Sequence, residues 1–188
     1  MEPSFSHTLR ASAVRAAFAT AILLLIPLLA MYFTDEVKWD LADFLVAGAL
    51  LFAVGFAWRL ATVRTGDGAY RIAMGFAIAA MLLLVWSNLA VGVIGAENNP
   101  ANRLYFAVPA IGFLGAALAR FRPFGMALAL IVAAIAQVLI TLAVFGIGIG
   151  DPWSEPREVV WLNGFFVLLY CGSAGLFWRS ARGSTASS

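Results

Sequence analysis

The chain has 188 residues, of which 63% are hydrophobic and 12% charged, and its formal net charge is +2. A water-soluble domain carries about 45–50% apolar and about 25% charged residues. The surplus apolar surface therefore excludes an ordinary soluble domain. The basic residues do not form the clustered stripe of a nucleic-acid site, which excludes that class of partner.

Six apolar stretches come close to the length of about 20 residues that a helix needs to cross a membrane. They cover residues 14–33, 41–60, 72–94, 104–119, 124–149 and 159–178. Strands of a membrane barrel would alternate apolar and polar residues, and these stretches do not. The sequence predicts an all-α polytopic membrane protein with six transmembrane helices.

Residues 1–13 are predicted to be a cytoplasmic arm, residues 14–182 one transmembrane domain, and residues 183–188 a disordered tail. The first span is interpreted as an uncleaved anchor, because no small-residue cleavage site follows it. The fourth span is short, since Arg103 and Arg120 bracket only sixteen residues, or about 24 Å of helix. A re-entrant segment is the alternative there.

Orientation follows from the positive charges. When alternate connections are assigned to one side, that side collects nine basic residues and the other collects three. Such an asymmetry marks the cytoplasmic side of a bilayer. The nine are Arg10, Arg15, Arg59, Arg64, Arg71, Arg120, Arg122, Arg179 and Arg182, and the three are Lys38, Arg103 and Arg157. Both termini are therefore expected in the cytoplasm of a bacterial cell.

The second and sixth spans end alike, as GFAWR at 55–59 and GLFWR at 175–179. Two interpretations fit this likeness. The six helices form three in-out-in hairpins of common origin, or two helices carry the same interfacial Trp-Arg anchor.

No Asp, Glu, Lys, Arg or His lies near the middle of any span, which disfavours an ion-coupled carrier. Along the fifth span, small and then polar residues recur every four positions, at Gly125, Ala129, Ala133, Gln137 and Thr141. The sixth span offers a matching row of Asn163, Phe166, Tyr170 and Ser173. Both rows predict helix-packing faces.

The remaining polar groups define a candidate cluster in the outer half of the membrane and the loop above it. Its members are Asn88, Glu97, Asn99, Asn102, Arg103, Gln137 and Asn163. Intramembrane polar side chains are candidates for function. The competing interpretations are hydrogen bonds between helices, a structured cap made by the loop, and a ligand-contacting pocket.

Catalytic and cofactor chemistry is restricted by what the sequence contains. There is one histidine, His7, and one cysteine, Cys171. One histidine does not form a bis-His haem site, and one cysteine does not form a cysteine-based metal site. His7 lies in the N-terminal arm, which disfavours a Ser-His catalytic pair within the membrane. We expect no cofactor, no metal and no catalytic residue, and an inert, buried Cys171 thiol.

Residues 86–102 contain the pattern W-x-N-L-A-V-G-x-I-G-x-E-x-N-P-A-N, and residues 119–123 read ARFRP. These segments resemble an uncharacterised family of small bacterial multi-pass inner-membrane proteins, over roughly residues 43–137. The resemblance implies a bacterial inner-membrane setting. It implies no activity and assigns no site residue.

Three functions remain open. The first is a non-enzymatic scaffold, accessory subunit or helix-packing oligomer, with a second copy or another membrane protein as partner. The second is a carrier or facilitator for a small neutral or zwitterionic solute that binds the polar cluster. The third is a membrane enzyme using outer-loop carboxylates, namely Asp35, Asp40, Asp43, Asp151 and Glu155.

Overall fold

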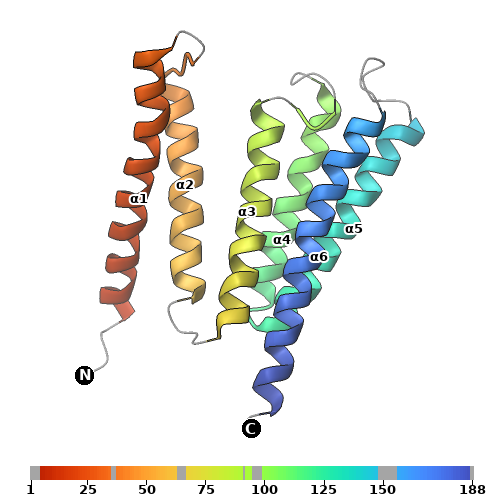
Figure 1. Cartoon of the computed structure of the whole chain (residues 1–188). Helices are drawn as coiled ribbons and strands as arrows, with labels where there is room; N and C mark the ends of the chain where they lie inside the picture. Colours follow the sequence, from red (N-terminus) through yellow and green to blue (C-terminus); the bar gives the residue numbers. More distant parts are fainter. Residues whose placement is uncertain are drawn as a thin grey trace. The chain divides into compact units, whose positions relative to one another are not determined.

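The computed structural model describes residues 5–34, 37–62, 67–90, 92–94, 99–147 and 156–186, and none of these forms a strand. Figure 1 shows the helices α1 to α6. The sequence predicted one transmembrane domain over residues 14–182. That extent stays a prediction, and the chain divides into two compact units, Met1–Arg64 and Thr65–Ser188.

The first unit is an antiparallel pair of helices, α1 (Phe5–Phe33) and α2 (Leu41–Thr62). Two glycines of α2 face α1, and a Cβ at either would make an ordinary van der Waals contact. A Cβ added at Gly55 would lie 3.5 Å from Ala16 Cβ, and one at Gly48 would lie 3.4 Å from Leu24 Cδ1. Van der Waals packing at small residues contributes to helix association in lipid.

Two of the five carboxylates that the sequence assigned to outer loops, Asp40 and Asp43, lie at the start of α2. The backbone N–H of Asp40 donates to Asp43 Oδ2, and that of Asp43 donates to Asp40 Oδ1, both at 2.9 Å. This reciprocal arrangement satisfies N–H groups that the first turn of a helix leaves without partners. The other three carboxylates, Asp35, Asp151 and Glu155, lie outside the described residues.

The second unit contains α3 (Gly68–Ala90), the 3-10 helix η1 (Pro100–Phe106), α4 (Ala107–Leu118), α5 (Pro123–Ile147) and α6 (Pro156–Ala186). Helix α6 packs against both α3 and α5, and α4 packs mainly against α5. The hairpins α1–α2 and α5–α6 are closely packed pairs. Helices α3 and α4 touch each other far less, so the hairpin expected from the third and fourth spans is not a closely packed pair.

Several helix ends differ from the sequence prediction. Helix α3 ends at Ala90 rather than at residue 94, and Gly92 has φ 77°. Glycine adopts this left-handed conformation readily, so the chain turns there although the segment is apolar. Helix α6 continues to Ala186, into the tail predicted to be disordered, and α1 begins at Phe5, inside the predicted arm.

The fourth span is longer than the sixteen residues expected from the sequence, because η1 extends it at its N-terminal end. Pro100–Leu118 forms a continuous stretch of 19 residues that is apolar enough to cross a membrane. A 3-10 helix rises about 2.0 Å per residue and an α-helix about 1.5 Å, so η1 and α4 together reach about 32 Å.

The described residues thus include six helices long and apolar enough to span a membrane. Large apolar side chains point outward, while alanines fill much of the interior of the second unit. Ala73, Ala80 and Ala133 are fully buried, whereas Leu118 is 85% exposed. This pattern is that of a multi-pass membrane protein, in which small residues let helices approach and large ones meet lipid.

The predicted packing face of α5 is confirmed. Ala129, Ala133, Gln137 and Thr141 are all buried, and Gly125 faces Ala119 across the turn from α4. A Cβ at Gly125 would lie 2.5 Å from Ala119 Cβ, and one at Gly115 of α4 would lie 2.6 Å from Ala129 Cβ. Glycine is therefore required at both positions for α4 and α5 to pack as they do.

Candidate functional site

The loop between α3 and α4 is held by the side chain of Asn102. Its Oδ1 accepts hydrogen bonds from the backbone N–H of Val93 at 2.9 Å and of Ile94 at 2.8 Å. Asn102 and these two residues are buried. An unpaired N–H in an apolar interior costs several kcal/mol in lipid, so this one side chain makes the irregular segment 92–94 acceptable there.

Two further asparagines form hydrogen bonds in the same region, between the end of α3 and η1. Asn88 Nδ2, near the end of α3, donates to the backbone oxygen of Asn102 at 2.9 Å. Asn99 caps η1, because its Oδ1 accepts from Ala101 N at 2.9 Å and its backbone oxygen accepts from Asn102 N at 3.0 Å. Asn is a preferred residue at such a cap. Three of the four asparagines of the candidate cluster, Asn88, Asn99 and Asn102, therefore lie together and bond the backbone.

A second polar group lies between η1, α5 and α6. Gln137 Nε2 donates to Asn163 Oδ1 at 2.8 Å, and Asn163 Nδ2 donates to the backbone oxygen of Val159 at 2.8 Å. Tyr105 and Thr141 share a hydrogen bond of 3.0 Å between their hydroxyls. Thr141 Oγ1 also donates to the backbone oxygen of Gln137 at 2.8 Å. These contacts link the packing faces of α5 and α6 that the sequence predicted.

Tyr105 is the member that sequence reasoning missed. It is fully buried, although it lies in a run that reads as the apolar start of the fourth span. Its position three residues after Asn102 was the available signal, because residues three apart in a 3-10 helix lie on the same side. Tyr105 and Asn102 both belong to η1, so this one short helix contributes a residue to each of the two polar groups.

Two predicted members of the cluster remain, Arg103 and Glu97. Arg103 is exposed. Glu97 lies outside the described residues, and so does any ion pair between it and Arg103. Cys171 corrects another expectation, because it is exposed on α6 rather than buried.

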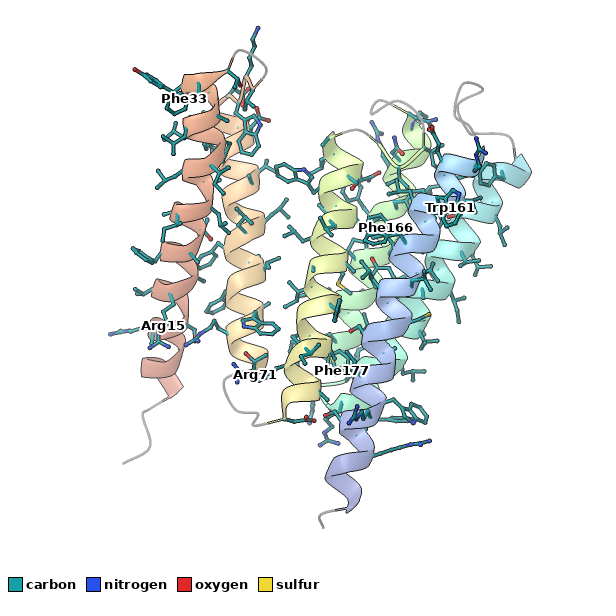
Figure 2. All side chains as sticks on the ribbon, in the orientation of Figure 1. Arg15, Phe33, Arg71, Trp161, Phe166 and Phe177 are labelled. Atoms are coloured by element: carbon teal, nitrogen blue, oxygen red, sulfur yellow. The ribbon has the colours of Figure 1, made fainter. Side chains whose placement is uncertain are left out.

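Further contacts tie α6 to α3. Ser173 Oγ donates to the backbone oxygen of Ala73 at 2.7 Å, and Phe166 and Tyr170 are buried beside it on α6. Figure 2 labels Phe166 on the stretch of α6 that faces the other helices of this unit. The four-residue row predicted on α6 is thus confirmed as a packing face.

Three buried polar atoms have no hydrogen-bond partner among the described residues of this unit, namely Asn88 Oδ1, Gln137 Oε1 and Tyr170 Oη. The site offers amide and hydroxyl groups, which bind neutral or zwitterionic molecules through hydrogen bonds. The described residues contain no cluster of three or more metal-binding side chains.

Comparison with known proteins returned no matching family model, no matching curated protein and no matching solved structure.

Proposed function

We propose that this protein is a non-enzymatic component of the bacterial inner membrane that works by lateral packing against other transmembrane helices, with both termini in the cytoplasm. The observation that carries the proposal is how the intramembrane polar groups are used. Gln137 bonds Asn163, Tyr105 bonds Thr141, and Asn88 and Asn102 bond backbone. These bonds hold the helices of the second unit together, as expected of a scaffold.

The outer face of α6 supplies a surface for such packing. Gly164, Leu168, Cys171 and Gly175 follow one another at spacings of four, three and four residues, which places them on one stripe of the helix. All four are exposed, and a Cβ added at either glycine would meet nothing within 4 Å. This stripe, called the α6 seam below, allows another helix backbone to approach closely.

The seam contains the only cysteine of the chain, which gives a direct test. Native membranes holding the full-length protein are treated with a short bismaleimide cross-linker, and the products are separated by mass. If two copies meet at the seam, a dimer forms through Cys171. Replacing Gly175 with leucine is expected to reduce the dimer strongly, because the larger side chain keeps the helices apart.

Gly146→Leu is the matched control, since Gly146 lies on α5 and its Cβ would also meet nothing within 4 Å. It is expected to leave the cross-linked dimer unchanged, and Cys171→Ser removes the dimer altogether. A product of higher mass containing a different membrane protein would favour an accessory subunit. A strict monomer in the membrane, without any cross-linked partner, would contradict the proposal.

A second candidate is a facilitator for a small neutral or zwitterionic solute. The unpartnered acceptor at Gln137 Oε1 and the unpartnered hydroxyl of Tyr170 favour it, because a solute could bond to them inside the membrane. Proteoliposomes would be tested for uptake of neutral and zwitterionic solutes. Uptake that is lost in Gln137→Leu, at unchanged thermal stability, would support a facilitator, and no uptake above protein-free vesicles would remove it.

A further inference from the structure

Three segments far apart in the sequence meet at the end of the second unit where α3 begins. The rings of Tyr70 and Phe177 pack edge to face at 5.0 Å, and those of Phe124 and Trp178 lie 5.3 Å apart. Tyr70 Oη donates to the backbone oxygen of Phe121 at 2.8 Å. The start of α3, the turn between α4 and α5, and the last part of α6 therefore form one surface, and Figure 2 shows Phe177 and Arg71 at this end.

This surface, called the basic end below, carries a large excess of positive charge. Its five arginines are Arg71, Arg120, Arg122, Arg179 and Arg182, and all are exposed. The single acidic residue among its described positions is Asp67. The basic end thus has a formal charge of about +4, which attracts anions within about one Debye length.

The side chain of Asp67 forms hydrogen bonds within the protein. Its Oδ1 accepts from the backbone N–H of Ala69 at 2.8 Å, at the start of α3. A hydrogen bond from Ser180 holds the pKa of the Asp67 carboxyl below its usual value, helped by backbone hydrogen bonds and the charge of Arg179, while desolvation opposes the shift. The carboxylate therefore stays ionised and fixes α3 to α6.

The turn that carries two of the arginines has an unusual backbone. Arg120 and Phe121 have φ of 50° and 58°. Phe121 N bonds Ala116 O and Arg120 N bonds Ala117 O, which is the helix ending that normally places glycine at the position of Arg120. A non-glycine residue there costs about 1–2 kcal/mol. Conformational cost of this kind is concentrated at functional sites.

The surroundings match a lipid rather than a free anion. Ile72 and Phe124 are 54% and 56% exposed beside the arginines, so apolar surface for acyl chains adjoins the charge. The guanidinium of Arg182 lies 5.6 Å from the ring centre of Trp178, and tryptophan is enriched at the headgroup level of a bilayer. Arginine pairs with phosphate through two parallel hydrogen bonds.

We propose that the basic end is a binding site for the phosphate of an anionic phospholipid, held by Arg120 and Arg122 with the arginines of α3 and α6 around it. This inference does not rest on the proposed scaffold function. An arginine near an anionic lipid surface contributes about 1 kcal/mol, or about fivefold in apparent affinity. Removing two is expected to weaken binding about 25-fold.

The test uses full-length protein in detergent, titrated with phosphatidylglycerol or with phosphatidylcholine of the same acyl chains, and native mass spectrometry counts the bound lipids. Wild type is expected to retain phosphatidylglycerol in preference. In Arg120→Gln/Arg122→Gln the affinity for phosphatidylglycerol should fall about 25-fold, while the affinity for phosphatidylcholine stays the same. Arg71→Gln/Arg182→Gln serves as a second pair if the first misfolds, which thermal unfolding without added lipid would reveal.

Arg103→Gln/Arg157→Gln removes the same charge at other exposed positions and is expected to leave the preference intact. Arg120→Lys/Arg122→Lys keeps the charge but not the paired hydrogen bonds, so its affinity should fall between wild type and the glutamine pair. The proposal is overturned if wild type shows no preference, if the lysine pair equals wild type, or if Arg103→Gln/Arg157→Gln loses as much. Displacement of the lipid by equimolar inorganic phosphate would also overturn it.

Discussion

At the residue scale, the side chain of Asn102 replaces hydrogen bonds that a longer α3 would have made. The chain leaves the helix after Ala90, and Gly92 turns it, so the N–H groups of Val93 and Ile94 lose their helical acceptors. One amide oxygen accepts from both. A carbonyl oxygen has two lone pairs, which is why a single asparagine suffices where an apolar residue would leave two donors unpaired.

Asn102→Ala is therefore expected to destabilise the protein by about 2–6 kcal/mol, since each buried donor left without a partner costs about 1–3 kcal/mol. Asn99→Ala removes one cap interaction and should cost about 1 kcal/mol. Both are measured by titrating the purified protein from mild detergent into dodecyl sulfate and following helix content. Equal losses of unfolding free energy in the two variants would mean that the Asn102 side chain does not hold the loop in place.

At the element scale, the contact between α4 and α5 depends on glycine rather than on large apolar side chains. Gly115 faces Ala129, and the position for a Cβ on Gly115 lies 3.3 Å from Ala129 Cα as well as 2.6 Å from its Cβ. Two rigid helices do not yield locally to one added methyl group, so the whole contact has to widen.

We expect Gly115→Ala to destabilise the protein by about 1–3 kcal/mol, as overpacking of a close contact does. The double variant Gly115→Ala/Ala129→Gly moves the methyl group to the other helix and should recover most of the loss. Gly146→Ala, with open space at its Cβ, should be neutral or slightly stabilising. The same unfolding titration measures all three, and a double variant no more stable than Gly115→Ala would show that the two residues do not meet.

At the scale of the whole molecule, the number of membrane crossings and the distribution of positive charge each predict where the termini lie, and the two predictions have to be the same. An even number of crossings puts both termini on one side, and nine of the twelve basic residues lie in connections assigned to that side. The fourth crossing is the one on which this agreement depends, and η1 with α4 provides 19 residues for it.

We expect both termini in the cytoplasm. A fluorescent protein fused after Ser188 should be bright and alkaline phosphatase at the same position inactive, because the phosphatase folds only after export. Alkaline phosphatase inserted after Asn99 should be active. An inactive enzyme at Asn99 together with an active one at Ser188 would mean that the orientation is reversed, and active enzyme at both would mean that the crossings are not six.

The sequence by itself determined the helical class, the six helices long and apolar enough to span a membrane, and the buried faces of α5 and α6. Length and hydropathy are properties of each segment alone, and the four-residue spacing of Gln137 and Thr141 shows which side of α5 is covered. It also indicated the asparagines of the segment between α3 and α4 as candidates. It did not show what each of them binds.

Only the tertiary structure decided which helix covers which face. A periodic row of residues looks the same in the sequence whichever helix packs on it. The spacing therefore did not predict that α6 packs against both α3 and α5, or that Cys171 is exposed. Nor did it predict that α1 and α2 form a unit of their own. The partners of Asn102 and Tyr105 depend on how the loop and η1 are turned. Such hydrogen bonds join residues that hydropathy treats independently, and they form only once the helices are in place.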